Sequence, residues 1–430
     1  MYIDTFLKKS STIAYTSSKA ADRHQVSIAE ALSQFAVENS DYYKQWMFDS
    51  PIVVKYETAA VAQELQKLVS RAIKEFVNNY SSYEHLMPVS DDVKRVLTIA
   101  NRKEYEIGTY RTDFVYDMQR NMRLIEITCR FALNGLFLPA VMQHVADQYT
   151  NRYCPEVSTQ DLYSAVGVYL EQKFKGSNKI FVLKGEDKRN ASKIYYDLLT
   201  KVGYDIQQVA YEDLVTVLDT IENHDNVISE LALEEIESLD DSTIESFASK
   251  NVINDLRTIF LIHDKRFFAV LYNEEFKSKI FTIEEKVFFE QFTIPTYTYS
   301  TANMAYWKGA MYDKDNWIIK HSTLGKSQQI YAGIVMSQAE WLALFEQSNI
   351  EKMILQQWVP QSTLTGTIGA ERYQDYITGT LLYFDDHFFG FGDFRTSSHP
   401  VINVVDHRKY CSVILDKNAN AAGFEDHNIY

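Results

Sequence analysis

The sequence predicts a mixed fold of the α+β or α/β type with a helical N-terminal region. A stripe of apolar residues at helical spacing, from Val61 to Phe76, predicts a long helix whose stripe packs in a core. Two segments of alternating character within residues 111–128 predict a β-hairpin. Strands predicted over 178–185 and 204–214 flank a helix predicted over 190–203, an alternation typical of a parallel sheet.

Composition limits the function classes. A chain of 430 residues, 46% of them hydrophobic, can form two or three domains with sizeable cores. A net charge of −15 argues against nucleic acid as the main partner, because phosphate binding needs a basic surface. Cys129, Cys154 and Cys411 form no CxxC pair, and no apolar run reaches about 18 residues. We therefore expect a cytoplasmic protein with no membrane partner.

The hairpin contains two acids that a regular pairing would place opposite each other. With a loop at Met118–Asn121, Asp117 pairs with Met122, Asp113 faces Glu126, and Arg111 faces Thr128. In this pairing Leu124 shares a face with Glu126, while Phe114 and Ile125 point to the other face. Like charges directly opposite each other destabilise a hairpin. Either a hard cation such as Mg²⁺ lies between the two carboxylates, or both acids face water.

In the last third of the chain, the predicted strand, polar loop, strand and helix follow one another in the order typical of a lid that covers a polyphosphate. The segment "WIIK" predicts a strand that ends in Lys320, and the polar loop "HSTLGKSQQ" brings Ser322, Thr323 and Gly325. A second strand, "IYAGIVM", is followed by a capping box at Ser337–Glu340 that starts a helix. A lysine in this position can neutralise phosphates, although strands often end in lysine for no such reason.

Further candidates lie around this lid. Lys308 could be a second phosphate lysine or an exposed helix residue. Gln356 and Gln357, in the predicted strand "KMILQQWVP", could read an adenine edge through the backbone and one side chain. Arg395, in the segment "GDFRTSS" of a hairpin predicted over 378–398 with its turn at Asp385 and Asp386, could neutralise a transferred phosphoryl group or form a surface salt bridge.

Two other segments have simpler interpretations. Seven acids from Glu230 to Glu245 predict a solvated helix or linker, not a metal site. Residues 257–273 predict a strand followed by a helix. Neither segment adds a candidate functional residue.

The order "RTD", "EIT", a Rossmann-like unit, "WIIK" and "ILQQWV" resembles the circularly permuted ATP-grasp family, in particular the synthetase domain of glutathionylspermidine synthase and its homologues. The family pattern is R-x-D, about a dozen residues, then E-x-N. The resemblance implies ATP and Mg²⁺ as cofactors, with Asp113, Glu126 and Thr128 as metal ligands and Arg111 serving the substrate or acyl phosphate. Thr128 replaces the family's asparagine, and the loop after Lys320 has few glycines.

The resemblance also implies a domain organisation. We expect a helical region over 1–104, the first part of an ATP-grasp core over 105–164, a Rossmann-like unit over 165–300, and the nucleotide-binding part over 301–430. Arg111 and Arg395 are the expected catalytic residues. Lys308, Lys320, Ser322, Thr323, Gly325, Gln356 and Gln357 are the expected nucleotide-binding residues.

The implied activity is that of an ADP-forming carboxylate–amine ligase acting through an acyl phosphate. The expected partners are a small carboxylate and an amine, such as an amino acid, peptide or polyamine, and a homodimer is left open. One alternative is a degenerate ATP-grasp protein that binds nucleotide or a partner without ligation. Another is an unrelated α/β protein whose hairpin is structural.

Overall fold

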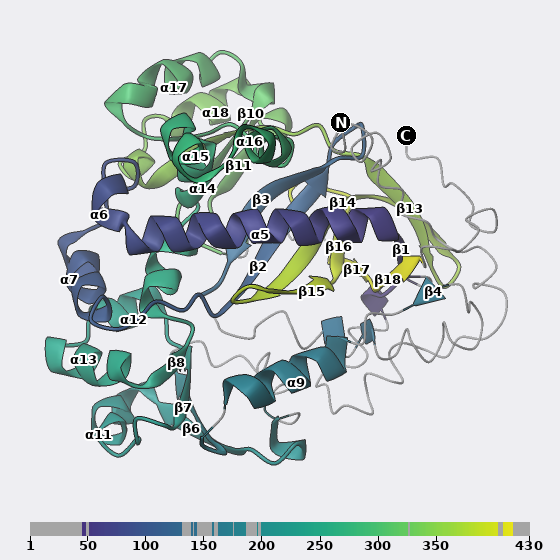
Figure 1. Ribbon diagram of the computed structural model, residues 1–430. Helices are drawn as coiled ribbons and strands as arrows, with labels where there is room; N and C mark the ends of the chain where they lie inside the picture. Colours follow the sequence, from purple (N-terminus) through teal and green to yellow (C-terminus); the bar gives the residue numbers. More distant parts are fainter. Residues whose placement is uncertain are drawn as a thin grey trace.

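A computed structural model describes residues 45–48, 51–130, 139–140, 142–143, 157–158, 162–174, 176–185, 196, 199–325, 327–402 and 407–415. Over these residues the chain is a mixed α/β protein with four sheets (Figure 1). The mixed fold class is therefore as predicted. The helix predicted over 190–203 falls largely outside the described residues, and the domain boundaries stay predictions.

An antiparallel sheet of seven strands unites two distant parts of the chain. Its central order is β17-β16-β14-β2-β3, and β13 and β15 also pair with β14. The strands are β2 (Thr109–Tyr116), β3 (Met122–Thr128), β13 (Thr363–Ile368), β14 (Glu371–Phe384), β15 (His387–Phe391), β16 (Phe394–Ser397) and β17 (Arg408–Tyr410). The predicted hairpin is thus β2–β3, and β14 pairs with β2 from Thr109 to Val115.

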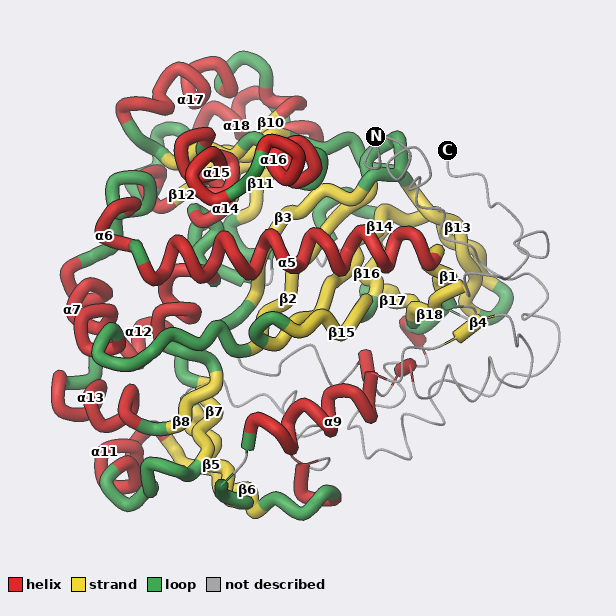
Figure 2. Tube along the Cα trace, viewed as in Figure 1, coloured by secondary structure: helices red, strands yellow, loops and turns green. Residues whose placement is uncertain are grey.

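The long helix α5 (Tyr56–Asn78) runs across the strands of this sheet, as Figure 2 shows. The predicted apolar stripe is buried, and it joins Phe114, Leu124 and Tyr383 in one core cluster. Ser70 of α5 hydrogen-bonds the Tyr110 hydroxyl at 2.7 Å and so fixes the helix to β2. Residues 52–55, within the region predicted to be helical, form the strand β1 (Ile52–Lys55), which pairs with β18 (Ser412–Leu415). β18 also pairs with β4 (Val157–Ser158).

A parallel sheet in the order β6-β5-β7-β8 confirms the predicted parallel layer. Its strands are β5 (Lys179–Lys184), β6 (Asp205–Ala210), β7 (Asn226–Glu230) and β8 (Asn251–Ile253). The helices around it are α7 (Asp91–Ala100), α9 (Leu162–Lys173), α11 (Leu214–Leu218), α12 (Leu233–Glu237) and α13 (Asp241–Ser249), while the short helix α6 (Tyr80–Tyr83) packs on α5. The acid-rich segment is mostly helical, but Glu230 is buried in β7 beside Lys184.

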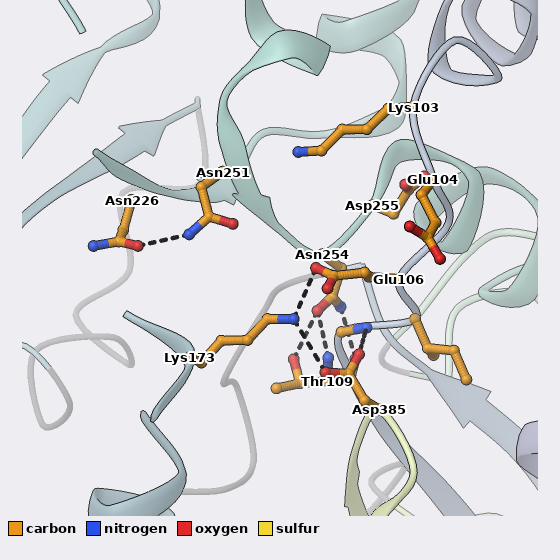
Figure 3. A network of polar contacts seen from close by, with 12 residues as sticks. Lys103, Glu104, Glu106, Thr109, Lys173, Asn226, Asn251, Asn254, Asp255 and Asp385 are labelled. Atoms are coloured by element: carbon orange, nitrogen blue, oxygen red, sulfur yellow. Dashed lines mark hydrogen bonds and ion pairs between the residues drawn. The ribbon is translucent and has the colours of Figure 1, made fainter. Parts of the chain in front are cut away.

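Polar contacts join this parallel unit to the seven-stranded sheet (Figure 3). The Asn254 amide donates to the carbonyls of Thr109 and Cys129 at 2.7 and 2.6 Å. Gly108, with a φ of +80°, leaves room for Asn254, since a Cβ there would lie 2.2 Å from the Asn254 Oδ1 atom. The turn at Asp385 exists as predicted, but its carboxylate accepts from the Gly108 backbone N–H at 2.8 Å.

Residues 257–273 are helical where a strand and a helix were predicted. A π-helix over Thr258–Ile262 precedes α14 (Phe267–Tyr272), and α15 (Glu274–Ile280) and α16 (Ile283–Glu290) follow. All five π-helical residues are buried. The apolar run "TIFLI" is too short for its period to separate a strand from a buried helix.

The fourth sheet is antiparallel, in the order β11-β10-β12-β9. Its strands are β9 (Thr296–Thr298), β10 (Trp317–His321), β11 (Ile330–Ala332) and β12 (Met353–Gln357), with helices α17 (Met304–Ala310) and α18 (Gln338–Leu344). The predicted order of strand, loop, strand and helix is confirmed. The capping box at Ser337 is also confirmed, because Ser337 Oγ accepts from the Glu340 N–H and Glu340 accepts from the Ser337 N–H.

Candidate functional site

A cleft lies between the β2–β3 hairpin and the sheet that contains β10 and β12. Apolar residues line one part, and charged residues from both sheets line another. The lining residues are Asp113, Val115, Ile125, Glu126, Ile294, Ile318, Lys320, Ser327, Ile330, Gln356, Gln357, Trp358, Val359, Gln361, Thr378, Arg395, Pro400, Val401 and Ile402. The fold therefore brings four predicted segments to one site. They are the hairpin over 111–128, the strand that ends in Lys320, the strand with Gln356 and Gln357, and the hairpin over 378–398.

The hairpin register places the two acids as predicted. Asp113 pairs with Glu126 and Arg111 pairs with Thr128. The register then shifts, so that Tyr116, not Asp117, pairs with Met122. Asp117 instead organises the turn, and its Oδ1 atom accepts from the backbone N–H groups of Gln119 and Asn121 at 2.9 and 2.8 Å.

The shift is a β-bulge at Ile125, and it changes which side chains share a face. Phe114 pairs with Leu124, and both are buried in the core under α5. Leu124 is thus on the face opposite Glu126, contrary to the strict alternation that was predicted. Ile125 lines the cleft instead of the core. The bulge lets the hairpin present a carboxylate to the cleft without withdrawing Leu124 from the core.

Cations neutralise both acids. Asp113 accepts from Arg111 Nε at 2.8 Å and pairs with Arg395 through its other oxygen. Glu126 lies 3.1 Å from the ammonium of Lys265, whose side chain is 1% exposed. These ion pairs remove the repulsion expected between facing acids. No group of three histidine, cysteine or acidic side chains that could hold a metal occurs among the described residues.

Lys320 is buried in the cleft wall at the end of β10. Its ammonium donates to Gln356 Oε1 at 2.7 Å and to the Ile125 carbonyl at 3.2 Å. Burial lowers the pKa of Lys320 to about 8, although Glu126 acts in the opposite direction. For Glu126, burial raises the pKa, but Lys265 and Lys320 outweigh burial and hold it well below its usual range. Near pH 7 the cleft therefore contains a charged lysine and a charged carboxylate.

Lys265 is the residue that the sequence analysis missed. It follows the π-helix and is buried against the hairpin, and its ammonium also donates to the Leu324 carbonyl at 2.6 Å. A lysine between the apolar runs "TIFLI" and "FFAVL" was the available signal, since lysine is almost never fully buried unless it is paired.

Several predicted residues lie elsewhere. Lys308 is exposed on α17 and does not line the cleft, which favours its alternative interpretation. Ser322, Thr323 and Gly325 lie in the loop after β10 but do not line the cleft, where Ser327 does. The Ser322 carbonyl accepts from the Lys265 backbone N–H at 2.8 Å. Thr128 is the register partner of Arg111. Neither residue lines the cleft.

The two glutamines differ in their availability. Gln356 is 1% exposed, and its amide contacts both Lys320 and Thr296, so its side chain is not free to read an adenine edge as predicted. Gln357 is exposed on the same strand and lines the cleft. Arg395 also lines the cleft, and its Nε atom has no hydrogen-bond partner among the described residues.

Comparisons with known proteins extend the description of the fold. The chain is similar to a glutathione synthetase-like effector, GSS30, from Globodera pallida, in its apoform, with a TM-score of 0.58 and 9% identity. The match covers 93% of this chain and 99% of that one. At this identity the similarity concerns the fold alone.

Two sequence comparisons do not assign the chain to a family. The model of the AnkG N-terminal domain matches residues 65–261, which is less than half of the chain. None of the curated proteins matches. Among the described helices, none has the length and apolar character needed to cross a membrane.

Proposed function

We propose that this chain is an ATP-dependent, ADP-forming carboxylate–amine ligase with an ATP-grasp-like fold of circularly permuted order. One observation carries the proposal: a single cleft combines an apolar part between two antiparallel sheets with a charged part containing Lys320, Arg395, Asp113 and Glu126. An apolar wall suits a flat base, and the lysine and arginine of the charged part suit a polyphosphate. The fold-level similarity to a glutathione synthetase-like effector agrees with this proposal as an analogy.

The proposed nucleotide lies with its base among Ile318, Ile330 and Val401 and with its phosphates near Lys320. The backbone of Gln357 would read the adenine edge. Lys265 is close enough to Glu126 to add positive charge at the same end. Ser322, Thr323 and Gly325, in the loop after β10, would contact the nucleotide only after that loop moved toward the cleft.

The residues present fit one Mg²⁺ ion shared with phosphates. Mg²⁺ is usually bound through one or two carboxylates together with substrate phosphates, and the neighbouring carboxylates Asp113 and Glu126 both line the cleft. Thr128 lies outside the cleft lining and is the weakest part of the proposed ligand set. When bound, the ion would neutralise phosphate charge. Asp113 would then share its oxygens between the ion and its arginines.

In the proposed reaction, a substrate carboxylate oxygen attacks the γ-phosphorus, and the bond to ADP breaks. An amine nitrogen then attacks the acyl carbon, phosphate leaves, and the amine gives up a proton. The protein's part is to position the groups and to stabilise charge. Arg395 faces the cleft and would stabilise the transferred phosphoryl group. Arg111 lies outside the cleft lining but pairs with Asp113, which lines the cleft. Arg111 would either hold the substrate carboxylate or hold Asp113 in place.

A second candidate is a protein that binds nucleotide, or a partner, without ligation. The observation that favours it is that Asp113 already pairs with two arginines and Glu126 with Lys265. A threonine in place of the family's asparagine agrees with this candidate. It differs from the ligase in making no acyl phosphate.

Trapping with hydroxylamine tests the proposal. The protein is incubated with ATP, Mg²⁺, hydroxylamine and pools of amino acids or peptides, and hydroxamate and nucleotide products are measured. A ligase of this class forms hydroxamate and ADP together, because hydroxylamine attacks any accessible acyl phosphate. Release of AMP and pyrophosphate would contradict the proposed chemistry. Tight ATP binding without hydroxamate from any pool would favour the second candidate.

A further inference from the structure

A chain of three hydrogen bonds leads from Lys320 into the wall of the proposed nucleotide cleft. The Lys320 ammonium donates to Gln356 Oε1 at 2.7 Å, and Gln356 Nε2 lies 2.9 Å from Thr296 Oγ1. The Thr296 hydroxyl lies 2.9 Å from the Ile294 carbonyl oxygen. Gln356 and Thr296 are register partners on β12 and β9, and their exposures are 1% and 2%. Water therefore has little access to the chain of bonds.

The groups at the two ends of this series of hydrogen bonds determine which atom donates and which accepts in each bond. A carbonyl oxygen can only accept, so the Thr296 hydroxyl donates to Ile294 and its oxygen accepts from the Gln356 amide nitrogen. An ammonium can only donate, so Lys320 requires an acceptor, which is the Gln356 amide oxygen. A flipped amide would set two donors against each other at Lys320 and leave the amide oxygen beside the hydroxyl. Both ends thus select the same amide orientation.

We infer that Thr296 and Gln356 are positioning residues that orient Lys320 for a phosphate. The inference rests on the proposed nucleotide site. Gln356 and the Ile125 carbonyl take two of the three N–H groups of Lys320, and the third has no acceptor among the described residues. Lys320 lines the cleft, so the third N–H is available to a ligand there. Thr296 acts at one remove, because its hydroxyl holds the amide that holds the lysine.

The neighbouring Lys265 shows the contrast. Its ammonium lies against the Glu126 carboxylate and the Leu324 carbonyl and is not part of the cleft lining. Lys320 is held by two neutral acceptors instead, so its charge is directed without being cancelled by an ion-pair contact. This difference suits Lys320 to contact an anionic ligand directly.

The test replaces Thr296 by valine, which has nearly the same shape but no hydroxyl. The Gln356 amide nitrogen then loses its buried acceptor, and the amide orientation is no longer imposed from the Ile294 side. Binding of the β,γ-imido analogue of ATP with Mg²⁺, and separately of adenosine, is measured by calorimetry. Since a charge-assisted hydrogen bond is at stake, we expect the dissociation constant of the imido analogue to rise about fivefold or more. Adenosine has no phosphate and should bind as before.

Two further variants make the test specific. Thr296→Ser retains the hydroxyl and should restore the affinity for the imido analogue. Thr298→Val is a matched control on the same strand, because Thr298 Oγ1 contacts Asn303 and no residue of the cleft lining. Unchanged binding of the imido analogue by folded Thr296→Val would overturn the inference. Equal weakening of both ligands would also overturn it, since that outcome indicates a local distortion of the base site.

This inference and the proposed ligase activity can fail separately. Phosphate-specific weakening in Thr296→Val without any hydroxamate from the wild type would support the positioning role and contradict the ligase. Hydroxamate formation by the wild type, together with unaltered binding of the imido analogue by Thr296→Val, would support the ligase and contradict the positioning role. A wild-type protein that binds neither probe would overturn both.

Discussion

The Lys265 ammonium lies 3.1 Å from a Glu126 carboxylate oxygen and 2.6 Å from the Leu324 carbonyl oxygen. One buried lysine thus joins the β2–β3 hairpin to the loop that follows β10. Lys265→Met should lower the melting temperature, because Glu126 loses its ion-pair partner. It should also weaken MgATP binding, measured by calorimetry, because Lys265 adds positive charge near the proposed phosphate end. Lys286→Met, at an exposed ion pair on α16, is the control.

Lys320→Ala should raise the dissociation constant for ATP about tenfold or more, since a charge-assisted contact to phosphate contributes about 1.5–3 kcal/mol. Lys308→Ala removes an equal charge from the exposed face of α17 and should have no such effect. Calorimetry on both folded variants decides the matter. Equal ATP affinity in wild type and Lys320→Ala would exclude Lys320 as a phosphate ligand.

Asp113→Asn and Glu126→Gln should each abolish Mg²⁺-dependent turnover while the fold persists. Removing a charge from a simple pair of facing acids would stabilise the protein, but Asp113 pairs with two arginines. We therefore expect Asp113→Asn to lower the melting temperature. MgATP should raise the melting temperature of the wild type by mass action and should raise it little in either variant. Full stabilisation by MgATP in both variants would contradict the metal assignment.

The pKa of Lys320, lowered to about 8 by burial, predicts that ATP binding depends on pH. The protonated ammonium binds phosphate, so the affinity should be full below pH 8 and should fall as the pH rises through 8 and the proton is lost. Calorimetry between pH 6.5 and 9.5 measures the effect. Lys320→Ala should lack this transition, and a wild-type profile that stays flat across this range would contradict the assignment.

A buried ion pair away from the cleft makes a stability prediction. Arg408 donates to both oxygens of Asp375 at 2.6 and 2.7 Å, and both side chains are buried between β14 and β17. Arg408→Met leaves the carboxylate without its partner and should cost about 3–5 kcal/mol in the free energy of unfolding. Arg372→Met, at an exposed position of β14, should change the free energy of unfolding by roughly 0.5 kcal/mol or less. Urea denaturation of both variants gives the comparison.

Local patterns carried much of the fold prediction. Alternation identified β2 and β3, helical spacing identified α5, and the order of strand, loop and capping box identified the lid-like sheet. The facing of Asp113 and Glu126 was predicted from the hairpin, although the predicted register at the turn was wrong by one residue and the bulge at Ile125 restores the facing. Lys320 could be selected because it ends a strand before a polar loop.

Other features depend on contacts that no local pattern contains. Lys265 meets Glu126 only because the helices after β8 pack against the hairpin, more than a hundred residues away in sequence. The role of Gln356 depends on β9, β10 and β12 being neighbours, which sets its amide between Lys320 and Thr296. The bulge at Ile125 was missed because Leu124 fits either face of a strand by composition, and the core under α5 decided between them.

The bulge at Ile125 also constrains how chains of this shape can diverge. Removing that one residue would restore strict alternation with Leu124 still in the core and Glu126 still facing the cleft, whereas regular pairing with Ile125 retained would turn either Glu126 into the core or Leu124 out of it. A two-residue insertion or deletion in β3 between Ile125 and the turn would keep both faces. Length variation between Ile125 and the turn among related chains should therefore occur in steps of two, whereas loss of Ile125 alone keeps both faces. A one-residue gap at Ile125 in an alignment should therefore coincide with a regular strand and an unchanged carboxylate in the cleft.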